Sequence, residues 1–315
     1  MREPALIRML PDGRRLHLHD GPIDLIIEAN GEPRAVSAAY EAAARRFVSI
    51  LDELCEELPL LRSHARKNAK RPRGAVAERM FAAVEPYCEQ TFITPMAAVA
   101  GSVAEAILES MTVPATLERA YVNNGGDIAI HLADSHRYKI GIVERPDRPS
   151  LFGFLEISAA DSIRGIATSG WRGRSFSLGI ADAVTVLADS ASAADAAATV
   201  IANAVNLPNH PGVTRIPARE ISPDSDLSDL LVTRGVEPLS QFEIDAALEN
   251  GLRLATRLRE KGLIHSAALC LQECTRVLPA TPTLSARLCR DGFLKPSAPG
   301  LHARLELSGR TNPHA

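Results

Sequence analysis

The chain has 315 residues, of which 46% are hydrophobic, 23% are charged and 4% are aromatic, and its net charge is −3. These values are typical of a soluble globular protein that can bury a substantial core. The slight acidic excess argues against a nucleic-acid-binding protein, and no apolar run reaches the roughly 18 residues that span a bilayer. No secretory signal is visible at residues 1–10, so the expected location is the cytoplasm.

The first 90 residues predict a β-hairpin, a third strand and two helices. Residues 5–10 and 15–19 flank the turn Pro11-Asp12-Gly13, and residues 23–28 add a strand. Residues 36–58 carry apolar side chains at steps of three and four, which is typical of a long amphipathic helix. A second helix is expected from Gly74 to Val84.

Between these helices, residues 62–73 crowd arginines and lysines around a proline. A solvated linker is the simpler interpretation. The alternative is an arm that contacts phosphate or an acidic partner.

The middle of the chain predicts a mostly antiparallel sheet preceded by a helix. A short β-like run at 91–94 is followed by an alanine-rich helix at 96–111. Strand-like runs separated by turn residues then follow at 115–122, 127–132, 138–143, 151–157, 164–168 and 183–187.

The last third predicts two further helices. Residues 191–205 form one, with Asp195 in its first turn, and residues 242–261 form the other, ended by Gly262. Residues 206–226 are expected to be a loop and residues 264–277 an apolar segment. Helices and strands alternate without a βαβ rhythm, so the expected fold class is α+β, with a mostly antiparallel sheet packed against long helices. We expect one domain over residues 1–278, with two lobes left open, and a loosely ordered tail over residues 279–315.

Five cysteines (Cys55, Cys88, Cys270, Cys274 and Cys289) have no paired spacing. A disulfide framework is therefore not expected. Cys270 and Cys274 would lie one turn apart on a helix, where buried apolar roles are favoured over a metal or redox pair.

Three short segments are suited to contacting a ligand. The first comprises Asn123, Asn124, Gly125, Gly126 and Asp127, between two strands. Glycines expose backbone N–H groups, and asparagines offer both a donor and an acceptor to the edge of a heterocycle. The alternative is a plain hairpin turn, for which Asn-Gly is a common sequence.

The second segment follows a strand and comprises Thr168, Ser169 and Gly170, then Arg174 and Ser175. Hydroxyl groups and arginines there can hold a phosphate. The spacing fits neither a Walker loop nor a nucleophile elbow. The sole tryptophan, Trp171, either covers a ligand ring or fills the core.

The third segment is the predicted helix that carries Asp195 and Thr199, which share one face because they are four residues apart. A carboxylate and a hydroxyl suit Mg²⁺ or Ca²⁺. The simpler alternative is a carboxylate near a helix start and a threonine bonded to its own backbone. Asp182 is interpreted as a strand-edge aspartate that could add a second carboxylate.

Three motifs, NNGGDI, ATSG and ADAxxT, occur in this order along the chain. Through these motifs the chain resembles the ApbE superfamily, the FAD:protein FMN transferases, whose fold is related to the T-fold. A segment similar to TPMAAVAG, from Thr94 onward, and the Ser177 end of the TSG stretch are shared with a short branch of that family of unknown function. Residues 247–271 match a late helix pair of the same branch. The resemblance implies a cleft for FAD or FMN, or another nucleotide-like ligand, with Mg²⁺ held by Asp195 and Thr199.

One departure from the family bears on activity. The chain lacks the His-x-x-Asp-Pro segment between Ser169 and Asp195, and no lysine stands beside Gly101. Flavin transfer to a protein is therefore not expected to follow from the resemblance, and no catalytic residue is assigned. The alternatives are an enzyme acting on a small organic acid or heterocycle, with Arg172 and Arg174 clamping a carboxylate, or a non-catalytic partner protein. A homo-oligomer is compatible with the sequence; nucleic-acid and membrane partners are not expected.

Overall fold

The computed structural model describes residues 4–143, 151–279 and 305–306. A nine-stranded sheet in the order β1-β2-β3-β4-β5-β8-β9-β12-β13 forms its centre. Every neighbouring pair in this sheet is antiparallel. Its strands are β1 (Leu6–Met9), β2 (Leu16–Asp20), β3 (Ile23–Asn30), β4 (Arg119–Asn124), β5 (Asp127–Leu132), β8 (Gly165–Ser169), β9 (Ala183–Ala188), β12 (Ser266–Leu271) and β13 (Cys274–Leu278).

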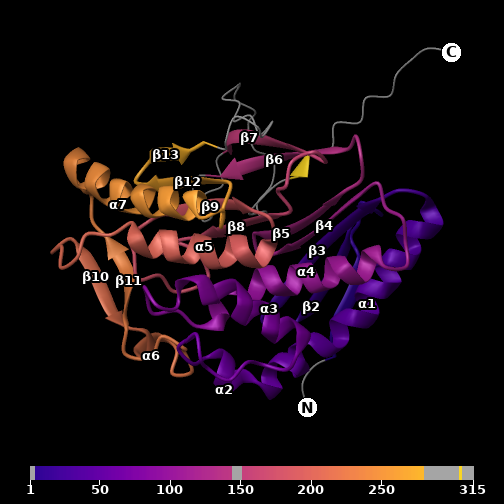
Figure 1. Ribbon diagram of the computed structural model, residues 1–315, viewed down its shortest axis with the longest axis horizontal. Helices are drawn as coiled ribbons and strands as arrows, with labels where there is room; N and C mark the ends of the chain where they lie inside the picture. The colour runs from indigo at the N-terminus through magenta and orange to yellow at the C-terminus, as the bar shows by residue number, and fades with distance from the viewer. Residues whose placement is uncertain (1–3, 144–150, 280–304, 307–315) are drawn as a thin grey trace, which may run out of the picture.

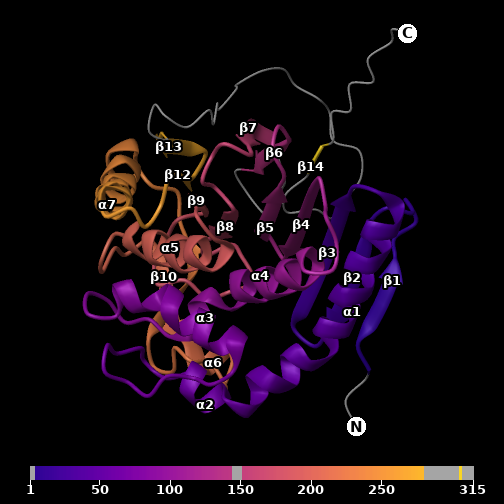
Figure 2. The same cartoon turned by 45° about the vertical axis from the view of Figure 1, so that its right-hand side comes forward.

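Helices cover one face of this sheet, here called the helical face (Figure 1). The helices are α1 (Pro33–Glu56), α2 (Leu58–Leu61), α3 (Ala75–Val84), α4 (Val99–Thr112), α5 (Ala191–Ala204), α6 (Ala218–Ile221) and α7 (Gln241–Glu260), with short 3₁₀ turns η1 (Glu85–Tyr87) and η2 (Pro95–Ala98). Figures 1 and 2 both show α4 and α5 meeting near the middle of the sheet. None of the helices in the described residues is long and apolar enough to span a membrane.

Two apolar cores lie on the helical face. One packs strands β2, β3 and β4 against α1 and α4, with Leu25 and Phe47 fully buried. The other packs β8, β9 and β12 against α5 and α7, with Ile201 and Leu269 fully buried. Both cores are built from the alternate residues of each strand, which point to one side of the sheet.

The opposite face, here called the outer face, carries a third core. A smaller sheet in the order β14-β6-β7 packs there, formed by β6 (Arg137–Val143), β7 (Leu151–Ser158) and β14 (Leu305–Glu306). Ile128 and Ile166 of the large sheet share this core with Tyr138 and Ile157. The expectation of an α+β fold with a mostly antiparallel sheet is therefore confirmed.

Helix ends follow the capping rules of the sequence. The Ser240 hydroxyl accepts the Glu243 N–H and the Glu243 carboxylate accepts the Ser240 N–H, so a capping box starts α7. Gly262, with φ of 71°, ends α7 in a Schellman motif in which the Leu263 N–H donates to the Leu258 carbonyl. The helix predicted at 242–261 is thus confirmed to within one residue.

Four local predictions are wrong. Residues 206–226 contain a strand, β10 (Val213–Pro217), which pairs with β11 (Leu231–Val236), and the short helix α6. Residues 91–94 form no strand. The second half of the expected helix pair is the hairpin β12–β13, so Cys270 and Cys274 lie on neighbouring strands. Asp195 lies in the second turn of α5.

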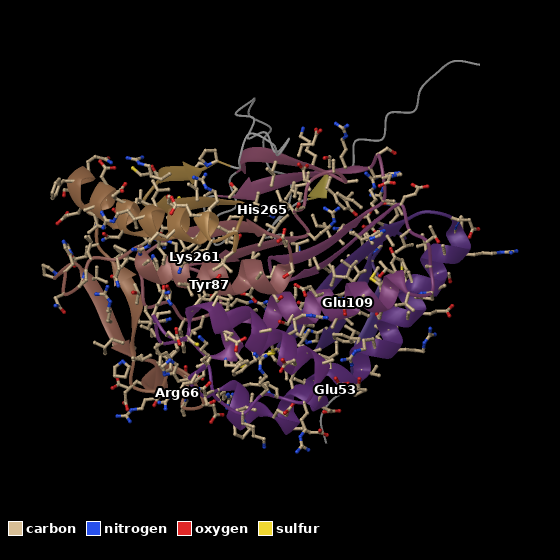
Figure 3. All side chains as sticks on the ribbon, viewed as in Figure 1. Glu53, Arg66, Tyr87, Glu109, Lys261 and His265 are labelled. Atoms are coloured by element: carbon tan, nitrogen blue, oxygen red, sulfur yellow. The ribbon has the colours of Figure 1, made fainter. Side chains whose placement is uncertain are left out.

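The basic segment at 62–73 packs partly on its own chain. Arg71 forms ion pairs at 2.7 Å with Glu78 and Glu85, and Lys67 lies 3.8 Å from Glu89. Figure 3 labels Arg66 on this segment, at the end of the molecule where α2 and α6 lie side by side in both ribbon views. The tail expected at 279–315 lies outside the described residues, apart from Pro279 and the two residues of β14. Leu305 and Glu306 of β14 pair with β6.

Candidate functional site

The candidate site lies where β5 meets β8, the seam between the two cores of the helical face. Only two residue pairs join these strands, Ile128 with Ile166 and Ala129 with Gly165. Beyond them, the Asp127 carboxylate accepts the backbone N–H of Thr168 at 3.1 Å. A side-chain carboxylate therefore replaces the next acceptor of the sheet ladder.

Strand alternation decides which predicted residues face the helices. Asn124, Asp127 and Ser169 lie on the helical face. Each is two residues along its strand from a buried residue of the helical cores, namely Val122, Ala129 and Ala167 respectively. Asn123 and Thr168 point to the outer face, where the Thr168 hydroxyl lies 2.9 Å from that of Thr185.

Asp195 reaches the same seam from α5. Its carboxylate accepts the N–H of Gly101 at 3.0 Å and a further hydrogen bond from the N–H of Ala100. These donors belong to the first turn of α4, a helix whose N-cap residue provides no side-chain hydrogen bond. Asp195 therefore caps α4 from a neighbouring helix, where the helix dipole favours a carboxylate.

The capping is reciprocal. Glu105 of α4 accepts the N–H of Ser192, in the first turn of α5, at 2.6 Å. The two helices cross in direct backbone contact, because a Cβ placed on Gly101 would lie 2.3 Å from the carbonyl oxygen of Ala191. The small residues expected at 96–111 thus allow the backbone of α5 to pack closely against α4.

The two carboxylates of the seam perturb each other. Burial raises the pKa of Asp127 to about 7, although the Thr168 N–H and the charge of Arg174 oppose the rise. Burial, followed by the nearby charge of Asp127, raises the pKa of Asp195 well above its ordinary value. Burial therefore disfavours the ionised form of both carboxylates, and the charge of Arg174 opposes this only for Asp127.

Arg174 is the cation beside this pair. It is exposed, and its Nη2 atom lies 1.9 Å from the position that a Cβ on Gly125 would occupy. Gly125 has φ of 64° in the β4–β5 turn, a conformation that favours glycine, and a side chain there would have to displace the guanidinium. The turn is fixed by Asn123, whose side chain accepts the Gly126 N–H at 2.8 Å, and by Asn124, which donates to the Ala100 carbonyl at 3.1 Å.

Thr199 follows Asp195 by one turn of α5 and is half-buried. Its hydroxyl makes no hydrogen bond within the described part of the chain, which removes the alternative in which it bonds its own helix. Among the described residues, no group of three or more His, Cys, Asp or Glu side chains could hold a metal ion. A cation at this seam would therefore need hydroxyl, ligand or water oxygens besides the two carboxylates.

Four of the predicted site residues have no role at the seam. The Thr94 hydroxyl donates to Asp226, in the segment that joins α6 to β11. The Ser177 hydroxyl donates to Asn203 at 3.2 Å, near the far end of α5. Ser175 is exposed, and Gly170 allows the backbone of Asp182 to approach closely, since a Cβ there would lie 2.5 Å from the Asp182 carbonyl oxygen.

Asp182 is more than a strand-edge residue. It is buried and accepts hydrogen bonds from the Trp171 indole at 3.1 Å, from Arg172 at 2.5 Å and from the Gln272 N–H at 2.6 Å. Arg172 is therefore engaged by Asp182, which leaves Arg174 without the second arginine of the expected clamp. A charged residue directly before a mostly apolar strand was the available sequence indication.

A family model described as AbpE bacteria matches residues 7–277. A UPF0280 protein of Methanopyrus kandleri is 36% identical over 183 residues, 57% of this chain and 69% of that protein. A UPF0280 protein of Methanosarcina barkeri is 43% identical over 116 residues, 36% of this chain, and the match spans only 44% of its length.

Among solved structures, the flavin transferase ApbE from Vibrio cholerae is similar with a TM-score of 0.39 at 13% identity, covering 89% of this chain and 99% of that chain. The apbe protein of Thermotoga maritima gives a TM-score of 0.36 at 13% identity, covering 80% and 77%. The family match extends over most of the chain and includes every residue of the seam. The chain therefore belongs to the family described as AbpE bacteria and is related to the UPF0280 proteins.

Proposed function

We propose that the protein binds a flavin or a similar nucleotide-like ligand through its phosphate groups, together with a divalent cation. The observation that supports this most is the convergence of Asp127 and Asp195, one from each half of the helical face, beside a single exposed arginine. Two partly buried carboxylates without a full set of partners are suited to a cation. Membership of the ApbE family supports the flavin.

The donor set fits magnesium. Carboxylate and hydroxyl oxygens are hard donors, and Mg²⁺ is usually held by one or two carboxylates together with water and substrate phosphates. Asp127, Asp195 and Thr199 would supply the protein oxygens. The cation would supply positive charge to the phosphates and to the carboxylate pair.

The remaining groups fit the ligand. Arg174 would pair with a phosphate, and the Ser169 hydroxyl, on the same face as Asp127, would donate to it. Because the His-x-x-Asp-Pro segment is absent, the proposal concerns binding and does not include flavin transfer to a protein.

Calorimetric titration of FAD in the presence of Mg²⁺ tests this proposal. The unaltered chain should bind, and Asp127→Asn and Asp195→Asn should each weaken binding at least about tenfold, since each removes one charge from the cation site. Asn preserves the shape of both side chains and an acceptor for the Gly101 N–H.

Asp134→Asn is the matched control, because Asp134 is exposed in the β5–β6 turn. It should bind FAD as the unaltered chain does. If the unaltered chain has no affinity for FAD with Mg²⁺, or if both seam variants keep full affinity, the proposal is wrong.

A further inference from the structure

Trp171 is the sole tryptophan of the chain and lies on the loop that carries Arg174. This loop leaves the end of β8 at the same end of the sheet as the β4–β5 turn, because β5 and β8 are antiparallel neighbours. Trp171 lies inside a turn in which the Gly173 N–H donates to the Gly170 carbonyl at 3.0 Å, and Arg174 directly follows this turn.

The indole does not fill the core. Trp171 is half-buried and belongs to none of the three apolar cores of the described residues. Phe176, on the same loop, is also partly exposed and outside these cores. An aromatic ring of this size gives large apolar contact when covered, so its partial exposure leaves that contact unused within the chain.

The ring is nevertheless held in one orientation. Its N–H donates to the buried Asp182 at 3.1 Å, and the Arg172 guanidinium stacks over the ring at 4.3 Å from its centroid. Asp182 also accepts Arg172 and the Gln272 N–H, so the same carboxylate fixes both stacked groups. An indole anchored at its polar edge and on one face is a preorganised surface for a second flat group.

We propose that Trp171 is the stacking platform for the flat heteroaromatic ring of the ligand, whose phosphate is held by Arg174 and the seam. This inference rests on the proposed function and names the part of the ligand that the seam does not contact. It assigns Asp182 as the residue that positions the platform.

Bound FMN tests the platform directly, because flavin emission is quenched on contact with an indole. With Mg²⁺ present, FMN bound to the unaltered chain should be nearly dark. Trp171→Phe, which keeps a ring that does not quench, should bind FMN within a few-fold and leave it bright. Trp171→Leu should weaken FMN binding about tenfold, the scale of one base–aromatic stack.

Inorganic pyrophosphate with Mg²⁺ is the matched probe for the phosphate part, and Trp171→Leu should bind it unchanged. Phe242→Leu is the matched control variant, because Phe242 is 83% exposed at the start of α7. It should behave as the unaltered chain with both probes.

The two ideas fail differently. Tight FMN binding that is equal in Trp171→Leu, with bright bound FMN in the unaltered chain, overturns the platform and keeps the proposed function. Absence of FMN and FAD binding to the unaltered chain overturns the proposed function and the platform with it.

Discussion

Burial in the folded chain raises the pKa values of Asp127 and Asp195. In the folded chain Asp127 has a pKa of about 7, against an ordinary value of 3.8. Between these two pH values the folded state keeps a proton that the unfolded state has released. Ionisation of Asp127 therefore opposes folding, and the free energy of unfolding falls as the pH rises from about 4 to 7. The raised pKa of Asp195 acts in the same direction.

We accordingly expect the unliganded chain to have a higher Tm at pH 5 than at pH 7.5, measured by circular dichroism. Asp127→Asn, which carries no titrating proton, should flatten that difference, whereas Asp134→Asn should not. Because a cation competes with the proton, Mg²⁺ should raise Tm more at pH 7.5 than at pH 5. An identical pH profile for Asp127→Asn and the unaltered chain would contradict this assignment.

At the scale of elements, the crossing of α4 and α5 determines where Asp195 lies. Each helix receives its cap from the other, through Asp195 and Glu105, and the contact leaves no space at Gly101. A wider crossing would withdraw the carboxylate from both the α4 N-terminus and the seam.

Gly101→Ala should therefore destabilise the protein by about 1–3 kcal/mol, the range for overpacked positions, despite the better helix propensity of alanine. Urea unfolding measures this change. The matched control is Gly235→Ala in β11, where a Cβ would meet its nearest atom at 3.6 Å. A Gly101→Ala chain as stable as the unaltered one would show that the crossing can relax.

Periodicity in the sequence was sufficient where one face of an element is buried. The apolar stripe at 36–58, the amphipathic pattern at 242–261 and the Gly262 stop predicted α1 and α7 well. At residues 264–277 a short apolar run without polar alternation fits a helix as well as a buried strand, so periodicity assigned neither, and the helix expected there from the family resemblance is wrong. The turn Gln272–Glu273 has positive φ at two residues that rarely adopt it, so no sequence rule for hairpins marked it.

The sequence predicted the part of the site that local sequence signals determine. Glycine and asparagine at 123–127 have a local explanation, and the structure places that turn at the seam. The partner of Thr94 lies 132 residues away in the chain, that of Ser177 lies 26 residues away, and those of Asp182 lie 10 to 90 residues away. Such long-range hydrogen bonds depend on the packed fold, and no local pattern encodes them.

At the scale of the whole molecule, the β10–α6–β11 segment is joined to the helical layer by polar contacts and by the packing of Val213 and Val236 against the core of α5 and α7. The Thr94 hydroxyl bonds Asp226, and the Thr233 N–H donates to the Ser177 carbonyl at 2.9 Å. Thr94 immediately precedes η2 and α4, so this segment is attached next to the element that Asp195 caps.

Asp226→Ala should loosen this segment without unfolding the rest. We expect faster amide hydrogen exchange over residues 213–236, with little change in exchange over α7 or the central strands. Asp224→Ala, two residues away and exposed, is the matched control and should leave exchange unchanged. Uniformly faster exchange across the chain would mean that Asp226 supports the whole fold.

The narrow β5–β8 pairing has a geometric consequence. Strands β1–β5 form one half of the large sheet and strands β8, β9, β12 and β13 form the other. Two residue pairs join β5 to β8, while the α4–α5 crossing and the outer core span both halves. Asp127 belongs to the first half, and Asp195 belongs to α5, which packs on the second. Any change in the angle between the halves would therefore disturb the α4–α5 crossing and the shared outer core, so a molecule bridging the two carboxylates would reinforce contacts that the fold already makes.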